Sequence, residues 1–161
     1  MNKRLTNFLD KQKAKYKLIK HKTVYTAYDA AATQGLKLKQ VAKTLLIKAD
    51  NKFIFAILPA SKRLDLNKLK KEMNRRQKKL GEKVTKKITI CNERQIVKNF
   101  TKGKGALAPF GSFYKTPTFI DKGLMKAKKI NLNAGTFTES LEMTPAMYKK
   151  VEKPVEGVIG K

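Results

Sequence analysis

The sequence has 161 residues, 41% of them hydrophobic, and its 38 basic against 12 acidic residues leave a formal charge of +26. One cysteine cannot form an intrachain disulfide, and with only one histidine the chain cannot build a zinc site of cysteines and histidines. No apolar run approaches the roughly 20 residues of a membrane span, so we expect no membrane partner.

The length predicts a single domain, residues 1–161, with a core of its own. The first 15 residues lack the apolar segment of a secretory signal, and the expected location is the cytoplasm. The charge makes nucleic acid the expected partner, because phosphates attract lysines at long range and this attraction weakens with salt. The alternative is that the excess of lysine over arginine reflects the composition of a whole proteome.

The first third of the chain predicts two helices and a hairpin. Residues 3–15 carry apolar side chains at helical spacing, and residues 16–19 predict a short strand. Residues 26–35 predict a second helix that begins at an N-cap threonine and ends at a glycine. Residues 42–60 predict a hairpin, and its second strand, 53–58, is apolar on both faces and therefore central.

The rest of the chain predicts further short strands and three helices, one of them a short helix that Asn92 caps and that runs through Val97. Asp65 is the expected N-cap of one helix, and Thr144 followed by Pro145 marks the start of the last one. The expected strands cover residues 86–91, 117–121, 128–135 and 140–143. Helices and strands mix without a strict βαβ rhythm. This order predicts an α+β fold, with a mixed, mostly antiparallel sheet or a distorted barrel and flanking helices.

Lys43 stands within the otherwise apolar run Val41–Ile47. Side chains alternate along a strand, so Lys43 shares a face with Leu45 and Ile47. If that face points inward, the ammonium is partly buried and needs a carbonyl, carboxylate or phosphate partner. The alternative is a lysine at the mouth of a strand whose ammonium reaches solvent.

Two other features are candidates for function, the loop between Gly105 and Gly111 and the single histidine. Gly105 and Gly111 bracket a proline-containing loop of small residues, which lets the backbone approach a ligand closely or serves as a plain connection. His21 is either an acid–base or adenosine-contacting residue or a structural one. Cys91 lies among strand-like apolar residues and is expected in the core. Glycine-rich phosphate loops and the aromatic signature of an RNA recognition motif are both missing.

In this order the pieces resemble the YbaK/ProX (EbsC) family of aminoacyl-tRNA deacylases, which edit mischarged prolyl-tRNA. The segments that carry the resemblance are HKTVYTAYDAA (21–31), QVAKTLLIK (40–48), FAILPASKRLDLNKL (55–69), GALAPFG (105–111), TFID (118–121) and NAG (133–135). The resemblance implies a YbaK-like editing domain that cleaves an aminoacyl ester without a cofactor or metal. The implied partners are the aminoacylated acceptor end of tRNA and prolyl-tRNA synthetase.

The resemblance also assigns roles to residues. Lys43 is implied as the catalytic residue, because an ammonium beside the ester carbonyl polarises it and stabilises the developing oxyanion. A protein nucleophile is not needed if a ribose hydroxyl of the terminal adenosine, or a thiol of the substrate, assists. The implied substrate-binding residues are His21, Thr26, Thr44, Gly105, Ala106, Leu107, Pro109, Phe110, Gly111, Asp121, Ala134 and Gly135.

The pair Lys43-Thr44 is similar to the cysteinyl-editing branch of the family, which implies hydrolysis of Cys-tRNA(Pro) in trans. An Ala-tRNA(Pro) deacylase, a non-catalytic tRNA-binding module of the same fold and a non-specific nucleic-acid-binding protein are the alternatives. Two segments depart from the family pattern. Residues 99–105 lack a Thr-Gly pair that many relatives carry, which affects the expected pocket shape. Residues 75–87 are unusually basic and favour extra affinity for the tRNA backbone.

Overall fold

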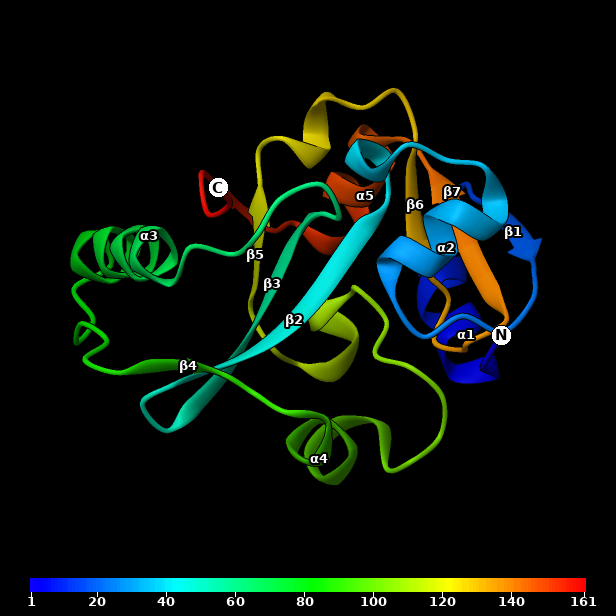
Figure 1. Ribbon diagram of the computed structural model, residues 1–161. Coiled ribbons are helices and arrows are strands. Elements are labelled where there is room, and N and C mark those ends of the chain that lie inside the picture. The colour runs from blue at the N-terminus through cyan, green and yellow to red at the C-terminus, as the bar shows by residue number, and fades with distance from the viewer.

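The computed structural model describes residues 1–161 and contains helices and strands in irregular alternation (Figure 1). The helices are α1 (Lys3–Lys11), α2 (Ala27–Gln34), α3 (Leu66–Lys79), α4 (Glu93–Ile96) and α5 (Pro145–Glu152). The strands are β1 (Lys17–Lys20), β2 (Ala42–Ala49), β3 (Lys52–Pro59), β4 (Ile88–Ile90), β5 (Thr118–Asp121), β6 (Ile130–Asn133), β7 (Glu139–Met143) and β8 (Val155–Gly157). None of the helices is long and apolar enough to cross a membrane.

Two open sheets form the framework. The larger has the order β4-β2-β3-β5-β8 and the smaller the order β1-β7-β6. All pairings are antiparallel except β3 with β5 and β5 with β8. A single bridge between Val41 and Asn131 links the two sheets. The predicted α+β fold with a mixed sheet is confirmed, and no closed barrel forms.

The predicted hairpin is confirmed. β2 and β3 pair along their whole length, and Ala49 lies opposite Lys52 across a turn in which Asp50 has φ 53°. β3 lies between β2 and β5 in the sheet, and its two faces pack in different hydrophobic clusters, which explains why its residues are apolar at both parities. Phe55 points into the main core, whereas Ile54 joins the smaller cluster beneath α3.

Side-chain caps set where the helices begin. Thr26 and Thr144 each accept a hydrogen bond from the backbone N–H three residues later, as predicted. Asp65 accepts bonds from the first turn of α3. α1 ends at Lys11, earlier than expected, because Lys13 adopts a left-handed conformation with φ 55° that a helix cannot continue.

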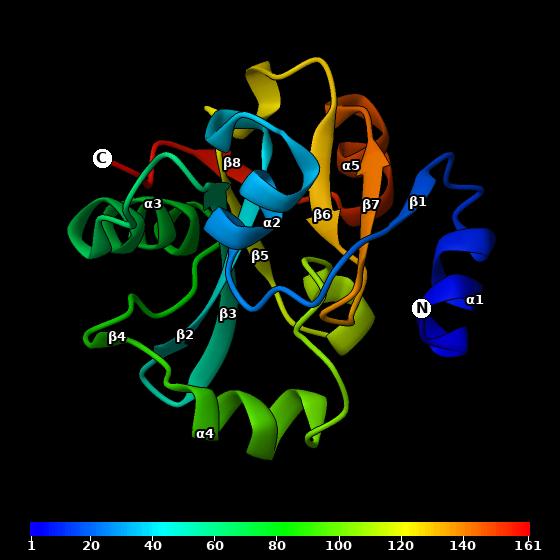
Figure 2. The ribbon, with the colours of Figure 1, turned by 45° about the vertical axis from the view of Figure 1, so that its right-hand side comes forward.

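The main hydrophobic cluster lies between the two sheets and is covered by α1 and α5, which Figure 2 shows on the same half of the molecule. Leu5 and Leu9 enter it from α1, and Tyr148 and Val151 from α5. Smaller clusters lie beneath α3 and beneath α2. The helices therefore hold the two sheets at a fixed separation.

Two features were not predicted. After α4 the chain continues as a π-helix, Val97–Thr101, and leaves it through Lys102 in a left-handed conformation. Near the C-terminus β8 adds a parallel strand to β5. Short π-helical turns are rare and often occur at functional sites.

Candidate active site

A cavity of about 360 Å³ lies between α2, the beginning of β2, residues 101–107 and the β6–β7 pair. Seven of the predicted site residues line it: His21, Thr26, Lys43, Thr44, Gly105, Ala106 and Leu107. They come from three separate segments that the fold brings to one place. Histidine, cysteine, aspartate and glutamate side chains gather nowhere in groups of three that could hold a metal ion.

Lys43 is the second residue of β2 and its side chain is half-buried in the cavity wall. Its Nζ donates a hydrogen bond to the backbone carbonyl of Lys62. The ring centroid of Tyr28 lies 5.9 Å from Nζ, within range of a cation–π contact. A carbonyl is therefore the polar partner that the sequence led us to expect. An ammonium has three N–H donors, so two remain for a ligand.

The surroundings of Lys43 lower the pKa of its ammonium below the usual lysine value. Burial is the largest cause, because it penalises the charged form, and repulsion from the Arg63 guanidinium adds to it. The Tyr28 ring acts in the opposite sense, since its face attracts the cation. Because water is partly removed from this ammonium, its interaction with an oxygen of a bound ligand is strengthened.

His21 lies directly after β1, and both of its ring nitrogens are engaged. Nδ1 is 2.7 Å from the carbonyl oxygen of Lys22, so this nitrogen carries a proton. Nε2 is 2.8 Å from the hydroxyl of Ser140, which donates to it when the ring is neutral. The Ser140 oxygen also accepts a bond of 3.3 Å from the side-chain amide of Gln34. These contacts fix the imidazole in the cavity wall.

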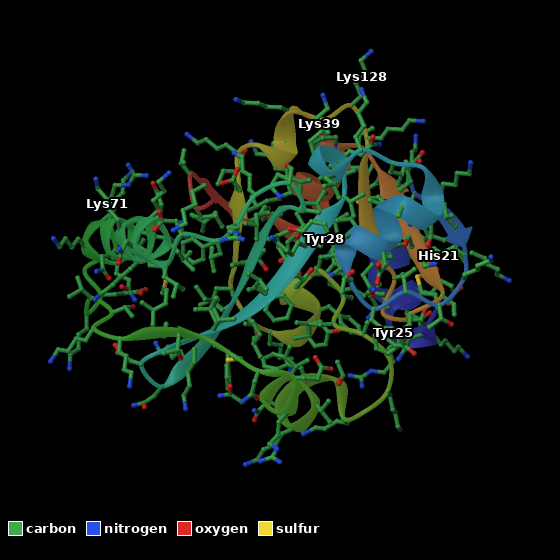
Figure 3. The ribbon with its side chains drawn as sticks, viewed as in Figure 1. His21, Tyr25, Tyr28, Lys39, Lys71 and Lys128 are labelled. Carbon is green, nitrogen blue, oxygen red and sulfur yellow. The ribbon has the colours of Figure 1, made fainter.

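Aromatic side chains form a rim around the cavity. Tyr25 and Tyr28 are 75% and 51% exposed, and Phe137 lies with its ring centroid 5.1 Å from that of Tyr25. Figure 3 shows Tyr25, Tyr28 and His21 gathered around α2. Exposed aromatic faces beside a cation are suited to stacking against nucleobases. These rings were not predicted from the sequence, because their exposure and convergence depend on the tertiary fold.

Residues 21–151 match the family model of the aminoacyl-tRNA editing domain. The chain belongs to this family. The fold of this editing domain is shared with the crystal structure of hypothetical protein APE2540, with a TM-score of 0.80 and 17% identity over 99% of this chain and 100% of that one. It is also shared with "a putative trans-editing enzyme for prolyl tRNA synthetase", with a TM-score of 0.76 and 17% identity over 98% and 95% of the two chains. None of the curated proteins matches the sequence.

Two glycines hold the loop of the editing domain against the β6–β7 turn. The N–H of Ala106 donates to the carbonyl of Gly135 at 3.0 Å. Gly105 has φ 81°, and a Cβ at this position would lie 2.2 Å from the Gly135 oxygen. Residue 105 is therefore glycine because its backbone lies against the backbone of Gly135 in the β6–β7 turn, where a side chain would not fit. Gly135 and the fully buried Ala134 support the cavity wall but do not line the cavity.

The second half of the 105–111 loop lies in the core. The carbonyl of Pro109 accepts a hydrogen bond from the Tyr148 hydroxyl, and the Phe110 ring is fully buried. The N–H of Gly111 donates to Thr118 Oγ1 at 3.1 Å. These three predicted site residues are thus outside the cavity and anchor the loop that lines it.

Asp121 also lies outside the cavity, and its carboxylate is buried. Its oxygens accept backbone N–H bonds from Gly123, Ile159 and Gly160. Its Oδ1 lies 3.1 Å from the ammonium of Lys62, the residue whose carbonyl binds Lys43. Burial alone would raise the pKa of Asp121, but these hydrogen bonds together lower it.

Proposed function

We propose that this editing domain is an aminoacyl-tRNA deacylase that hydrolyses mischarged tRNA(Pro) in trans, with Cys-tRNA(Pro) as its substrate. The observation that carries the proposal is the half-buried Lys43 ammonium, held by the Lys62 carbonyl in the wall of a cavity with an aromatic rim. Prolyl-tRNA synthetase, as the source of the mischarged species, is the proposed partner, and the cytoplasm the proposed location.

The proposed chemistry is cleavage of the ester that joins the amino acid to the terminal ribose. The free N–H donors of Lys43 bind the ester carbonyl oxygen. Water, or the thiol of the substrate cysteine, attacks the carbonyl carbon, and negative charge develops on the oxygen that Lys43 holds. The bond to the ribose oxygen then breaks, and that oxygen takes up a proton. A fixed cation at the oxyanion stabilises the transition state more than the ground state.

The side chains around the cavity do not offer an activated nucleophile, because none of the threonine hydroxyls that line it is hydrogen-bonded to a side-chain base. Cys91 is buried and does not line the cavity. The Ser140–His21 distance of 2.8 Å would suit an activated serine, but Ser140 is only 3% exposed and its oxygen is bonded to both His21 and Gln34. We therefore assign Ser140 a structural role and leave the attack to water or substrate.

The choice of amino acid follows from the residues next to Lys43. Ala42, Gly105 and Ala106 are small and leave room for a short side chain. The hydroxyl of Thr44 provides a polar neighbour for a thiol. Both features support cysteine, and alanine is the competing small substrate.

The test is a deacylation assay on Cys-tRNA(Pro), Ala-tRNA(Pro), Pro-tRNA(Pro) and Cys-tRNA(Cys). We expect the wild-type protein to hydrolyse Cys-tRNA(Pro) fastest. Lys43→Ala should lower kcat by about 10²–10³-fold, because it removes the oxyanion partner while leaving tRNA binding nearly intact. Lys48→Ala, which removes an exposed lysine of the same strand, is the matched control and should behave like wild type.

Two outcomes would contradict the proposal. Equal activity of Lys43→Ala and wild type would refute the role of the ammonium. If no aminoacyl-tRNA is hydrolysed although tRNA binds, the domain is a non-catalytic binding module. Faster hydrolysis of Ala-tRNA(Pro) would correct only the amino acid.

A further inference from the structure

A second cavity, of about 410 Å³, adjoins the first, because Thr101 and Ala106 line both. Its other walls come from the start of α1, the end of the π-helix and residues 113–115. The segment 101–106 thus borders the Lys43 cavity and this neighbouring one. A ligand that occupies both would run along this segment.

The second cavity is strongly basic. Arg4, Lys102, Lys104 and Lys115 line it, all four are exposed, and no acidic side chain is among its lining residues. None of these cations forms a salt bridge, although other lysines of the chain do pair with carboxylates. Lys102 Nζ donates to the carbonyl of Lys98 at 2.7 Å, but none of the four cations is neutralised by a carboxylate. Four such cations around one concavity favour a ligand with several negative charges.

Neutral hydrogen-bonding groups in the same segment are also free. Thr101 Oγ1 is the one buried side-chain nitrogen or oxygen of the chain without a hydrogen-bond partner. The N–H groups of Gly103 and Gly105 donate to no protein acceptor, and both residues have positive φ. Unbonded N–H and hydroxyl groups next to lysines are typical contacts of phosphate oxygens in nucleic-acid complexes.

We propose that this second cavity binds the phosphodiester backbone of the single-stranded 3′ end of the tRNA, immediately before the terminal nucleotide whose ester lies at Lys43. This inference rests on the proposed substrate. Phe100, Phe113 and Tyr114 also line the cavity and form an aromatic wall beside the cations. Single-stranded nucleic acid is commonly bound in this way, by a positive groove with interspersed aromatic side chains.

The test compares two triple variants that each lower the formal charge from +26 to +23. One is Lys102→Gln/Lys104→Gln/Lys115→Gln in the second cavity. The other is Lys122→Gln/Lys126→Gln/Lys128→Gln in the connection between β5 and β6, which lines neither cavity. All six lysines are exposed, so neither variant disturbs the core. Binding is measured with an acceptor-stem RNA hairpin that carries no amino acid and ends in single-stranded CCA, and with the same hairpin lacking these three nucleotides.

We expect the cavity variant to bind the CCA-ended hairpin at least 10-fold more weakly than the variant in the β5–β6 connection does. Its plot of log affinity against log salt should be less steep by about 2, the value for three lost contacts to a single strand. On the hairpin without CCA, both variants should bind alike. Thr101→Val should weaken binding of the CCA-ended hairpin alone, by about 3–10-fold, through loss of one hydroxyl contact.

The inference is overturned if both triple variants weaken binding of the CCA-ended hairpin equally. It is also overturned if the cavity variant loses as much affinity for the hairpin without CCA. Because the RNA carries no amino acid, these results do not depend on hydrolysis, and failure of the deacylation assay would leave them unaffected. On a hydrolysed substrate, the cavity variant should raise KM while kcat stays at the wild-type value, since its lysines bind substrate and transition state equally.

Discussion

Lys43 owes its position to contacts that end at a buried carboxylate. The carbonyl that binds its Nζ belongs to Lys62, and the side chain of Lys62 is held by Asp121. Asp121 in turn accepts N–H bonds from Ile159 and Gly160, so the C-terminal residues contribute to the site without touching it. The resemblance implied Asp121 as a substrate-binding residue, and the structure gives it an indirect position. It is a positioning residue for Lys62.

The titration of Lys43 should differ from that of an ordinary lysine. Burial and the Arg63 charge lower the folded-state pKa, so the ammonium loses its proton at lower pH than in the unfolded chain. Between the two pKa values the unfolded state binds more protons, and this site therefore makes the protein more stable as pH rises. In protein labelled with ¹³C-lysine, we expect one Cε resonance to titrate at lower pH than the other lysines and to be missing in Lys43→Gln.

Arg63→Gln tests whether repulsion from the Arg63 guanidinium contributes to the lowered pKa of Lys43. It removes the second contribution, so the Lys43 resonance should titrate closer to the usual lysine value while the burial effect remains. The deacylation rate of wild type, corrected for spontaneous ester hydrolysis, should fall with pH through the same pKa, because the ammonium is the active form. A Lys43 resonance that titrates with the bulk of the lysines would refute the shifted pKa.

At the scale of elements, the loop and the β6–β7 turn act as one unit. Gly105 touches the Gly135 carbonyl so closely that a Cβ would overlap it, whereas a Cβ at Gly81 would have no neighbour within 4 Å. Both glycines have positive φ, 81° and 72°, so alanine at either site costs about 1 kcal/mol of backbone strain. The two positions differ only in whether a neighbour must move.

Gly105→Ala should therefore lower the thermal midpoint more than Gly81→Ala, and it alone should lower deacylation activity. The added methyl group separates residues 105–107 from the turn and changes the cavity that they line. Circular dichroism melts and the deacylation assay measure the two effects. Equal melting points for the two variants would show that the contact between the loop and the turn does not hold the cavity in shape.

Elements with local signals formed where the sequence predicted them, as the caps of α2, α3 and α5 and the β2–β3 hairpin show. β8 has only three residues and is stabilised by pairing with β5, more than 30 residues earlier, so no local pattern marks it. For the same reason Ser140 and Gln34 could not be connected with His21 from the sequence. The cavity residues that were predicted came from the family resemblance, and Lys43, His21 and Gly105 were also candidates from the sequence itself.

At the scale of the whole molecule, exposed lysines are spread along the whole chain. Figure 3 shows Lys39 and Lys128 pointing outward at the top of the structure and Lys71 pointing outward at the left. A field of this kind attracts any polyanion and does not by itself select a tRNA. Under the proposed function, we expect selectivity to come from the two adjoining cavities, where donors without a carboxylate partner are close together.

Because exposed lysines attract the tRNA whereas Lys43 acts on the ester, salt should affect KM and kcat differently. Raising the salt from 50 to 200 mM should increase KM for the aminoacyl-tRNA by 10-fold or more, because each phosphate contact releases counterions. kcat should change less than 2-fold, since Lys43 acts within a partly buried cavity where ions screen poorly. Steady-state kinetics at the two salt concentrations measure both quantities. A kcat that falls with salt at constant KM would mean that exposed lysines take part in the chemical step, and the oxyanion role of Lys43 would then need revision.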